Sequence, residues 1–176
     1  MILVLMGVTS VGKTTLGKLL AAATGWNFED ADDYHSKENR HKMAAGIPLT
    51  DADREPWLKT LHERMLHSQE KGENAIFACS ALRQKYREQL ASGFAPREFC
   101  FIYLHATAAL IKERIALRHH PYMNPGLLSS QLDELEVPLH ALSVSVAGTP
   151  DEAVAEILAG LNKAGMLTIG NVDDPG

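Results

Sequence analysis

The sequence has few cysteines, few aromatic residues and no long apolar run. Only two of its 176 residues are cysteine, Cys79 and Cys100, and they lie far apart without a CxxC pair. This spacing argues against both a disulfide framework and a cysteine-based zinc site. Both thiols lie in apolar stretches, which is typical of buried, reduced cysteines.

The chain also lacks an excess of positive charge. Its formal net charge is −5 at pH 7, whereas binding along a nucleic-acid backbone requires a dense basic face. We therefore expect no nucleic-acid partner. A small anionic ligand remains compatible with this charge, because a few local arginines and lysines are enough to bind one.

No segment of the sequence resembles a membrane span. The opening stretch "MILVLMG" is too short to cross a bilayer, and it has neither a basic flank nor a cleavage signal. It is better interpreted as the first strand of a protein without a membrane partner. We expect a cytoplasmic location.

What the sequence does have is the composition and pattern of a globular α/β domain. Hydrophobic residues make up 45% and charged residues 22% of the chain, as in ordinary soluble domains. Short apolar runs predict strands, and the stretches between them have helical periodicity. This alternation predicts a parallel sheet with helices on both faces, which binds ligands at the carboxyl ends of its strands. The predicted strands cover residues 2–6, 26–30, 75–80, 98–105 and 142–148.

Helix boundaries are marked by capping residues. Thr50 followed by Asp53 forms a capping-box pattern, and Pro56 suits the first turn of the helix that carries Trp57. Further helices are expected at residues 13–23, 35–46, 82–91, 107–118, 129–136 and 149–161. The order of elements predicts a single domain over residues 1–165, with a peripheral tail at 166–176.

The first strand runs directly into a complete phosphate-binding loop, G-x-x-x-x-G-K-[ST]. Its glycines allow successive backbone N–H groups to point at phosphate oxygens, and the next helix adds its positive dipole end. Lys13 would reach the β- and γ-phosphates, and the Thr14 hydroxyl would bind Mg²⁺. The sequence therefore predicts a nucleoside triphosphate site made of Gly7, Val8, Thr9, Ser10, Val11, Gly12, Lys13, Thr14 and Thr15.

The loop alone does not distinguish a kinase from a switch or a motor. The guanine motif N-K-x-D is missing, and the strand at residues 75–80 ends in Cys-Ser rather than in a carboxylate. Carboxylates instead follow the second strand, at Asp30, Asp32 and Asp33. One could complete the magnesium shell, and another could accept a proton from an acceptor hydroxyl. A solvated acidic turn is the alternative for these residues taken alone.

Four blocks of the sequence resemble the gluconokinases of the small P-loop type, which are related in fold to shikimate and adenylate kinases. The blocks are "LMGVTSVGKTT", "DADDYHSKENRHKMAAGIPLTDADREPWL", "ACSALRQKYRE" and "FIYLHAT", and the resemblance runs from about residue 2 to 161. It implies a five-stranded parallel sheet with a mobile lid at about residues 119–128. It also implies a homodimer that uses ATP and Mg²⁺ to phosphorylate D-gluconate on its 6-hydroxyl.

The resemblance also implies roles for individual residues. Asp30 would join Thr14 at the metal, while Asp32 would act on the acceptor hydroxyl together with the catalytic Lys13. Arg54, or as second candidate Arg87, would hold the carboxylate of the sugar acid. The substrate-binding set is Asp32, His35, Lys42, Met43, Gly46, Leu49, Arg54, Ser80, Ala81, Leu82 and Arg87.

Some of these residues could have an ordinary structural role instead of contacting the substrate. His35 could be a capping or surface side chain, and Asp53 and Trp57 could serve as helix cap and core. Arg83 departs from the lysine that is common in the family, so we leave it out of the site.

Two arginines precede the expected lid. Arg114 and Arg118 are four residues apart and share one helix face. A solvated face is the ordinary interpretation, but the resemblance implies that both bind the nucleotide and that Arg118 is catalytic. The loop after them departs from the family pattern at residues 120–122, "HPY".

Two other functions remain open from the sequence. One is a related kinase with a different small acceptor, such as shikimate. The other is a nucleotide-binding regulatory module that has lost phosphate transfer, although the intact Lys13, Asp30 and Asp32 argue against it.

Overall fold

The computed structural model describes residues 1–117 and 125–167. Strands and helices alternate along the described chain, as the sequence pattern predicts. Their order is β1 (Ile2–Met6), α1 (Lys13–Thr24), β2 (Asn27–Asp30), the 3₁₀ helix η1 (Ala31–Tyr34), α2 (Lys37–Ala44), α3 (Asp51–Glu70), β3 (Ala75–Ala78), α4 (Gln84–Ala91), β4 (Phe99–His105), α5 (Ala108–Leu117), α6 (Pro125–Glu134), β5 (Leu142–Ser145) and α7 (Pro150–Lys163).

The strands form one parallel sheet in the order β2-β3-β1-β4-β5. The central strand β1 pairs with β3 on one side and β4 on the other, so that Leu5 lies between Ala78 and Ile102. All five residues of β1 are buried, because helices cover both faces of a parallel sheet. The predicted five-stranded parallel α/β fold is confirmed.

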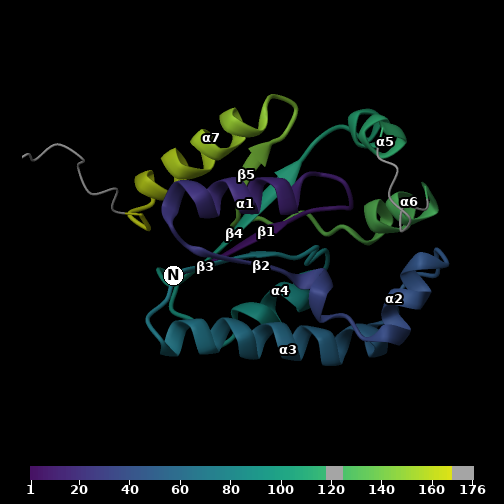
Figure 1. Ribbon diagram of the computed structural model, residues 1–176, viewed down its shortest axis with the longest axis horizontal. Coiled ribbons are helices and arrows are strands. Elements are labelled where there is room, and N and C mark those ends of the chain that lie inside the picture. The colour runs from purple at the N-terminus through teal and green to yellow at the C-terminus, as the bar shows by residue number, and fades with distance from the viewer. Residues whose placement is uncertain (118–124, 168–176) are drawn as a thin grey trace, which may run out of the picture.

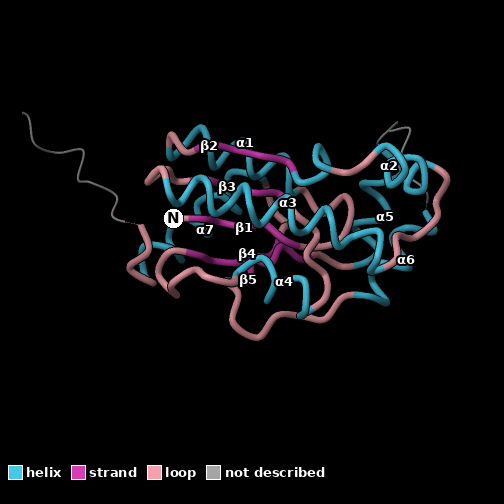
Figure 2. Tube along the Cα trace, turned by 90° about the horizontal axis from the view of Figure 1, so that it is seen from below, coloured by secondary structure: helices cyan, strands magenta, loops and turns pink. Residues whose placement is uncertain are grey.

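Helices form a layer on each side of the sheet. Figure 1 shows α1 and α7 over one face, and α3 with α4 over the other. Figures 1 and 2 both place α2, α5 and α6 at the end of the molecule opposite the N-terminus. The parallel strands run toward that end, so their carboxyl ends open between these three helices.

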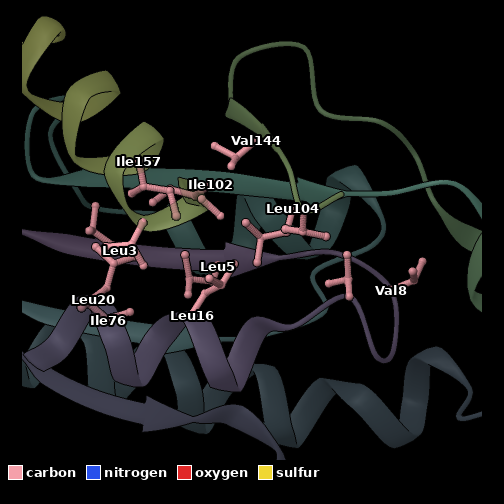
Figure 3. Packing of buried hydrophobic residues seen from close by; sticks show 14 of the residues in the cluster. Leu3, Leu5, Val8, Leu16, Leu20, Ile76, Ile102, Leu104, Val144 and Ile157 are labelled. Carbon is pink, nitrogen blue, oxygen red and sulfur yellow. The ribbon is translucent and has the colours of Figure 1, made fainter. Parts of the chain in front are cut away.

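The two layers enclose two apolar clusters. On one face Leu3 and Leu5 pack with Leu16, Leu20 and Ile157 from α1 and α7 (Figure 3). On the other face the alternate residues of β1 pack against α3 and α4; this second cluster includes Ile2, Val4, Met6, Leu61, Met65 and Phe77. Each buried side chain of this size contributes about 1.5–3 kcal/mol relative to an exposed one. The sheet is therefore held between two well-packed apolar clusters.

Local signals fix most helix boundaries. The Thr50–Asp53 capping box is present, and α3 begins at Asp51. Pro56 consequently lies in the second turn inside α3, so its expected place in the first turn was wrong by a few residues. Helix α7 also begins with a capping box, formed by Thr149 and Glu152, and Pro150 is its first residue.

Two expectations about the ends of elements also changed. The helix expected at residues 129–136 begins earlier and spans Pro125–Glu134. The first two tail residues, Met166 and Leu167, pack against the core cluster under α7, and residues 168–176 lie outside the described chain. Among the described helices, none combines the length and apolar character needed to cross a membrane.

Candidate active site

The loop between β1 and α1 has the backbone conformation that phosphate binding requires. Gly7 and Gly12 have φ angles of 139° and 109°, and Ser10 is also left-handed at 59°. A Cβ at position 7 would lie 2.5 Å from the carbonyl oxygen of Leu104, so only glycine fits there. Such a loop, followed by a helix N-terminus, directs a set of N–H groups into one concavity.

Lys13 folds back across the start of this loop. Its Nζ donates to the carbonyl oxygens of Gly7 and Val8, at 2.9 Å each. Desolvation lowers the pKa of Lys13, and the nearby charges of Asp32 and Asp30 oppose that shift. The ammonium group is thus held at the mouth of the loop, where it faces the acidic turn after β2.

The two predicted metal ligands lie side by side. The Thr14 hydroxyl donates to Oδ2 of Asp30 at 2.7 Å. A cavity of about 410 Å³ opens beside this pair and is also lined by Lys18, Asp33 and Tyr34. Residues 1–117 and 125–167 contain no cluster of three or more His, Cys, Asp or Glu side chains that could bind a metal without other ligands. One hydroxyl and one carboxylate suit Mg²⁺, which usually takes only one or two protein oxygens and otherwise binds phosphates and water.

Asp32 lies in η1, directly after β2. Its backbone N–H donates to Oδ1 of Asp30 at 3.1 Å, which caps η1. Although the carboxylate is 83% exposed, the surrounding protein raises its pKa by desolvation, and Lys13 opposes this while Asp30 and Asp33 add to it. The arrangement places an accessible carboxylate beside the phosphate loop.

His35 is buried behind Asp32 and is not a surface side chain. Only 5% of its side chain is exposed, and its ring stacks on Trp57 at 4.3 Å between centroids. Its Nε2 lies 3.9 Å from Oδ1 of Asp32, and its buried Nδ1 has no hydrogen-bond partner in the described chain. Burial, with the charges of Arg40 and Arg54, lowers the pKa of His35 to about 4. The imidazole is therefore neutral near pH 7.

Trp57 also has a structural role. Its Nε1 donates to the carbonyl oxygen of Ala31 at 2.7 Å, and the side chain is 5% exposed. This bond ties α3 to η1, the segment that carries Asp32. The core role considered for Trp57 is confirmed, and through His35 the same ring supports the site.

Four predicted substrate residues lie on α2 or between α2 and α3. Lys42 pairs with Asp53 at 2.6 Å, and this bond, together with the capping bonds from Thr50, lowers the pKa of Asp53 to about 2. The cap role considered for Asp53 is also confirmed. Leu49 is buried, while Met43 and Gly46 are partly exposed beside it in the chain.

Arg54 lies in a network of charged side chains. Its Nη1 donates to the Tyr86 hydroxyl at 2.9 Å, and its Nη2 pairs with Glu134 at 2.9 Å. Burial opposes its charge, but these two partners raise the pKa of Arg54. We call the following set the acceptor network: Asp51, Arg54, Arg83, Lys85, Tyr86 and Glu134.

The loop after β3 is held by Arg87. This side chain is 4% exposed, and its Nη1 donates to the carbonyl oxygens of Ala81 and Leu82 at 2.9 Å each. Ala81 has a left-handed φ of 42°, and the carbonyl oxygen of Ser80 accepts from the Gly7 N–H at 3.3 Å. Arg87 therefore supports the loop in this structure, with its Nη2 bonded to Gln84.

Arg114 lies beside the phosphate loop, as predicted. Its guanidinium donates to the carbonyl oxygens of Val11 and Val146, at 3.4 and 2.5 Å. A cavity of about 300 Å³ adjoins it and is also lined by Val146, Gly148 and Thr149. Its mixed apolar wall suits a flat base. The other predicted arginine, Arg118, and lid residues 119–124 lie outside the described chain.

Sequence reasoning missed the part of the site that follows β5 and the part on α6. The first could have been found, because Val146 and Gly148 follow the carboxyl end of a parallel strand. The second left no such signal. Gln131 Oε1 accepts from the Thr9 N–H at 2.6 Å, and Glu134 reaches Arg54 three residues later on the same helix.

Comparison with known proteins agrees with this geometry. The shikimate kinase family profile matches residues 9–157. A probable gluconokinase from Dictyostelium discoideum is 40% identical over 168 residues, which cover 89% of this chain and 84% of the relative. A gluconokinase from Gluconobacter oxydans is 39% identical, covering 89% of this chain and 88% of the relative.

A solved structure supports the same relationship. The crystal structure of a gluconokinase from Sinorhizobium meliloti 1021 matches with a TM-score of 0.82 and 40% identity, over 92% of this chain and 91% of that one. The shared fold and the identity across nearly the whole length leave no large segment unmatched. This chain belongs to the gluconokinase family and carries the shikimate kinase domain.

Proposed function

We propose that this protein transfers the γ-phosphate of ATP to the 6-hydroxyl of D-gluconate, giving 6-phospho-D-gluconate and ADP. The observation that carries the proposal is the position of the acidic turn beside the phosphate loop. Thr14 and Asp30 are in contact at 2.7 Å, and Asp32 follows two residues later. Relatives named gluconokinase at about 40% identity support the choice of acceptor.

The nucleotide is bound by residues 7–15, with the base in the cavity beside Arg114. Lys13 exchanges the carbonyl oxygens of Gly7 and Val8 for phosphate oxygens, which match its charge better. Arg118 offsets charge on the transferring phosphoryl group, as a positioned cation does in this reaction class. Arg114 and Arg118 both bind the nucleotide in this proposal.

Thr14 and Asp30 are the residues that would hold Mg²⁺. Bound there, the ion would neutralise charge on the phosphate oxygens during transfer. Asp32 accepts the proton of the attacking hydroxyl. Its raised pKa makes it a stronger base than an ordinary aspartate.

Arg54 binds the carboxylate of the acceptor. A planar guanidinium suits a carboxylate because it can donate two parallel hydrogen bonds. Arg87 is the weaker candidate, because its donors are used by the loop after β3. The hydroxyls of the sugar acid face the remaining predicted set, which is His35, Lys42, Met43, Gly46, Leu49, Ser80, Ala81 and Leu82.

The assembly and location follow the family resemblance. We propose a single kinase domain over residues 1–165 with a lid at about 119–128, in a cytoplasmic homodimer. Size-exclusion chromatography with light scattering measures the mass directly, and a monomer at working concentration would contradict the dimer.

The proposed reaction is tested by ADP release against a panel of acceptors. D-Gluconate should be turned over, and 6-deoxygluconate should compete with it without being phosphorylated, because it has the carboxylate but no nucleophile. Glucose should be a very poor substrate, since it lacks the carboxylate that would bind Arg54, and the loss of such a charged hydrogen bond costs about 1–3 kcal/mol. Shikimate turnover with inert gluconate would instead favour the related-kinase alternative, and nucleotide binding without any transfer would favour a regulatory module.

A further inference from the structure

Glu134, the last residue of α6, occupies the guanidinium groups of two arginines. Its Oε2 lies 2.9 Å from Nη2 of Arg54, and its Oε1 accepts from Nη1 of Arg54 at 3.3 Å. Nη2 of Arg83 approaches the same Oε1 at 3.5 Å. The two carboxylate oxygens therefore lie near the two terminal nitrogens of Arg54, with a hydrogen bond to Oε1 and an ion-pair contact to Oε2.

This contact is largely shielded from water. The side chains of Arg54 and Glu134 are 14% and 16% exposed, and Oε2 of Glu134 is buried, with Arg54 as an ion-pair partner but no well-directed hydrogen bond. Asp51, the other carboxylate of the acceptor network, instead contacts Lys85 at 2.5 Å and Arg83 at 3.6 Å. Glu134 is thus the carboxylate that neutralises Arg54.

We propose that Glu134 is a specificity-determining residue, an internal carboxylate that holds Arg54 and Arg83 until the carboxylate of the acceptor replaces it. The inference rests on the proposed function, because it assumes an acidic acceptor bound at Arg54. A sugar acid exchanges one carboxylate for another at the same guanidinium edge. A neutral sugar offers only hydroxyls, which form weaker bonds to a charged donor, so it leaves Glu134 in place.

Helix α6, which carries Glu134, contacts both the phosphate loop and the acceptor network. Gln131, one turn earlier on α6, accepts from the Thr9 N–H in the phosphate loop. Residues three apart lie on the same helix face, so one face of α6 contacts both the phosphate loop and the acceptor network. During exchange at Glu134, α6 stays held by Gln131 and by Glu136, whose backbone N–H donates to the Leu82 carbonyl oxygen at 3.0 Å.

The decisive measurement is the affinity for D-gluconate by calorimetry without nucleotide, in wild-type protein and in Glu134→Gln. The amide keeps the size of the side chain but removes the competing charge. We expect the dissociation constant to fall by about 5-fold or more, as for loss of a partly exposed ion pair. The KM for ATP should stay within about 2-fold of the wild-type value.

The matched control is Asp133→Asn, which removes the same charge from an exposed neighbour on α6. The exposed side chain of Asp133 makes no hydrogen bond or ion pair with residues 1–117 or 125–167, so gluconate affinity should not change. A second variant, Glu134→Ala, should also bind gluconate more tightly and guards against an effect peculiar to the amide. Thermal unfolding of each variant checks that the fold persists.

The outcomes separate this inference from the proposed function. If wild-type protein phosphorylates gluconate but Glu134→Gln and Glu134→Ala bind it equally or more weakly, Glu134 positions the arginines and does not compete with the acceptor. Equal tightening in Asp133→Asn would reduce the effect to net charge and would also overturn the inference. If wild-type protein phosphorylates no sugar acid, the proposed function fails first, and the inference fails with it.

Discussion

The donor half and the acceptor half of the site are built in different ways. The donor half, residues 7–15, offers mainly backbone N–H groups in a loop held between a buried strand and a helix. The acceptor half consists of side chains from α2, α3, α4 and α6 that pair with one another, such as Arg54 with Glu134 and Lys42 with Asp53.

The difference lies in what must change when a ligand binds. Backbone amides in a fixed loop are already oriented toward a phosphate, so little reorganisation is needed. Charged side chains that neutralise one another must exchange partners before they can bind a substrate, which lowers affinity and increases selectivity. We therefore expect substitutions in the donor half to affect turnover, and those in the acceptor half to affect substrate binding.

Asp32 lies where the two halves meet, and its loss should have the largest effect. Asp32→Asn should keep ATP binding but lower kcat by about 10³-fold, because an amide cannot accept the proton of the hydroxyl. Single-turnover kinetics with ATP and gluconate measure this loss of phosphate transfer. If Asp30→Asn proves far more damaging to transfer than Asp32→Asn, the two roles are exchanged.

Lys13 tests the donor half alone. Lys13→Ala should lower kcat by at least about 10²-fold, because the ammonium acts on charge that develops during transfer. Its two hydrogen bonds to loop carbonyl oxygens are part-buried, but desolvation of the ammonium opposes their contribution, so thermal unfolding should change little. A variant with an unchanged melting temperature and near wild-type turnover would disprove the role given to the phosphate loop.

Arg54 tests the acceptor half, with Arg87 as its matched control. Arg54→Ala should raise the KM for gluconate by about 10- to 100-fold, as expected for the loss of a charged hydrogen-bond donor, with little change in the KM for ATP. Arg87→Ala should mainly lower the melting temperature, because it removes the donor to the buried carbonyl oxygens of Ala81 and Leu82. The opposite pattern would assign the carboxylate to Arg87.

Asp53 gives the smallest expected effect, on stability and not on chemistry. Its pKa is lowered to about 2 by Lys42 and Thr50, so it stabilises the fold above its ordinary pKa near about 3.9 and loses that effect as the pH falls toward 2. Asp53→Asn should lower the melting temperature by a few degrees at pH 7, and the difference should shrink between pH 4 and 2. Calorimetry at several pH values measures this, and a constant difference would rule out the carboxylate as its source.

The donor half could be predicted from the sequence because its chemistry follows chain order. A strand, a glycine loop and a helix are consecutive, so Lys13 and Thr14 are placed by local geometry alone. Asp30 also followed from the rule that ligands bind at the carboxyl ends of parallel strands. The same rule could have found Val146 and Gly148, but the last strand was not used in this way.

The acceptor half resisted prediction because its contacts join residues far apart in the chain. Arg54 and Glu134 are 80 residues apart, and nothing in the local pattern around either of them indicates the other. Sequence reasoning assigned Arg87 a possible substrate contact, and in the structure this buried side chain of α4 donates to the loop after β3. The prediction that Pro56 lies in the first turn was wrong for a simpler reason. The capping box, and not the proline, determines where α3 begins.

The stacked pair of Trp57 and His35 gives the protein an internal optical reporter. The chain has two tryptophans, Trp26 and Trp57, and the second lies against the ring that supports Asp32. A protonated imidazole quenches indole emission more strongly than a neutral one, and the pKa of His35 is about 4. In a Trp26→Phe background the emission should therefore stay steady from pH 8 to about 5 and fall only below that range. Within the steady range, a change in intensity on adding an acceptor would report rearrangement next to Asp32, without any label.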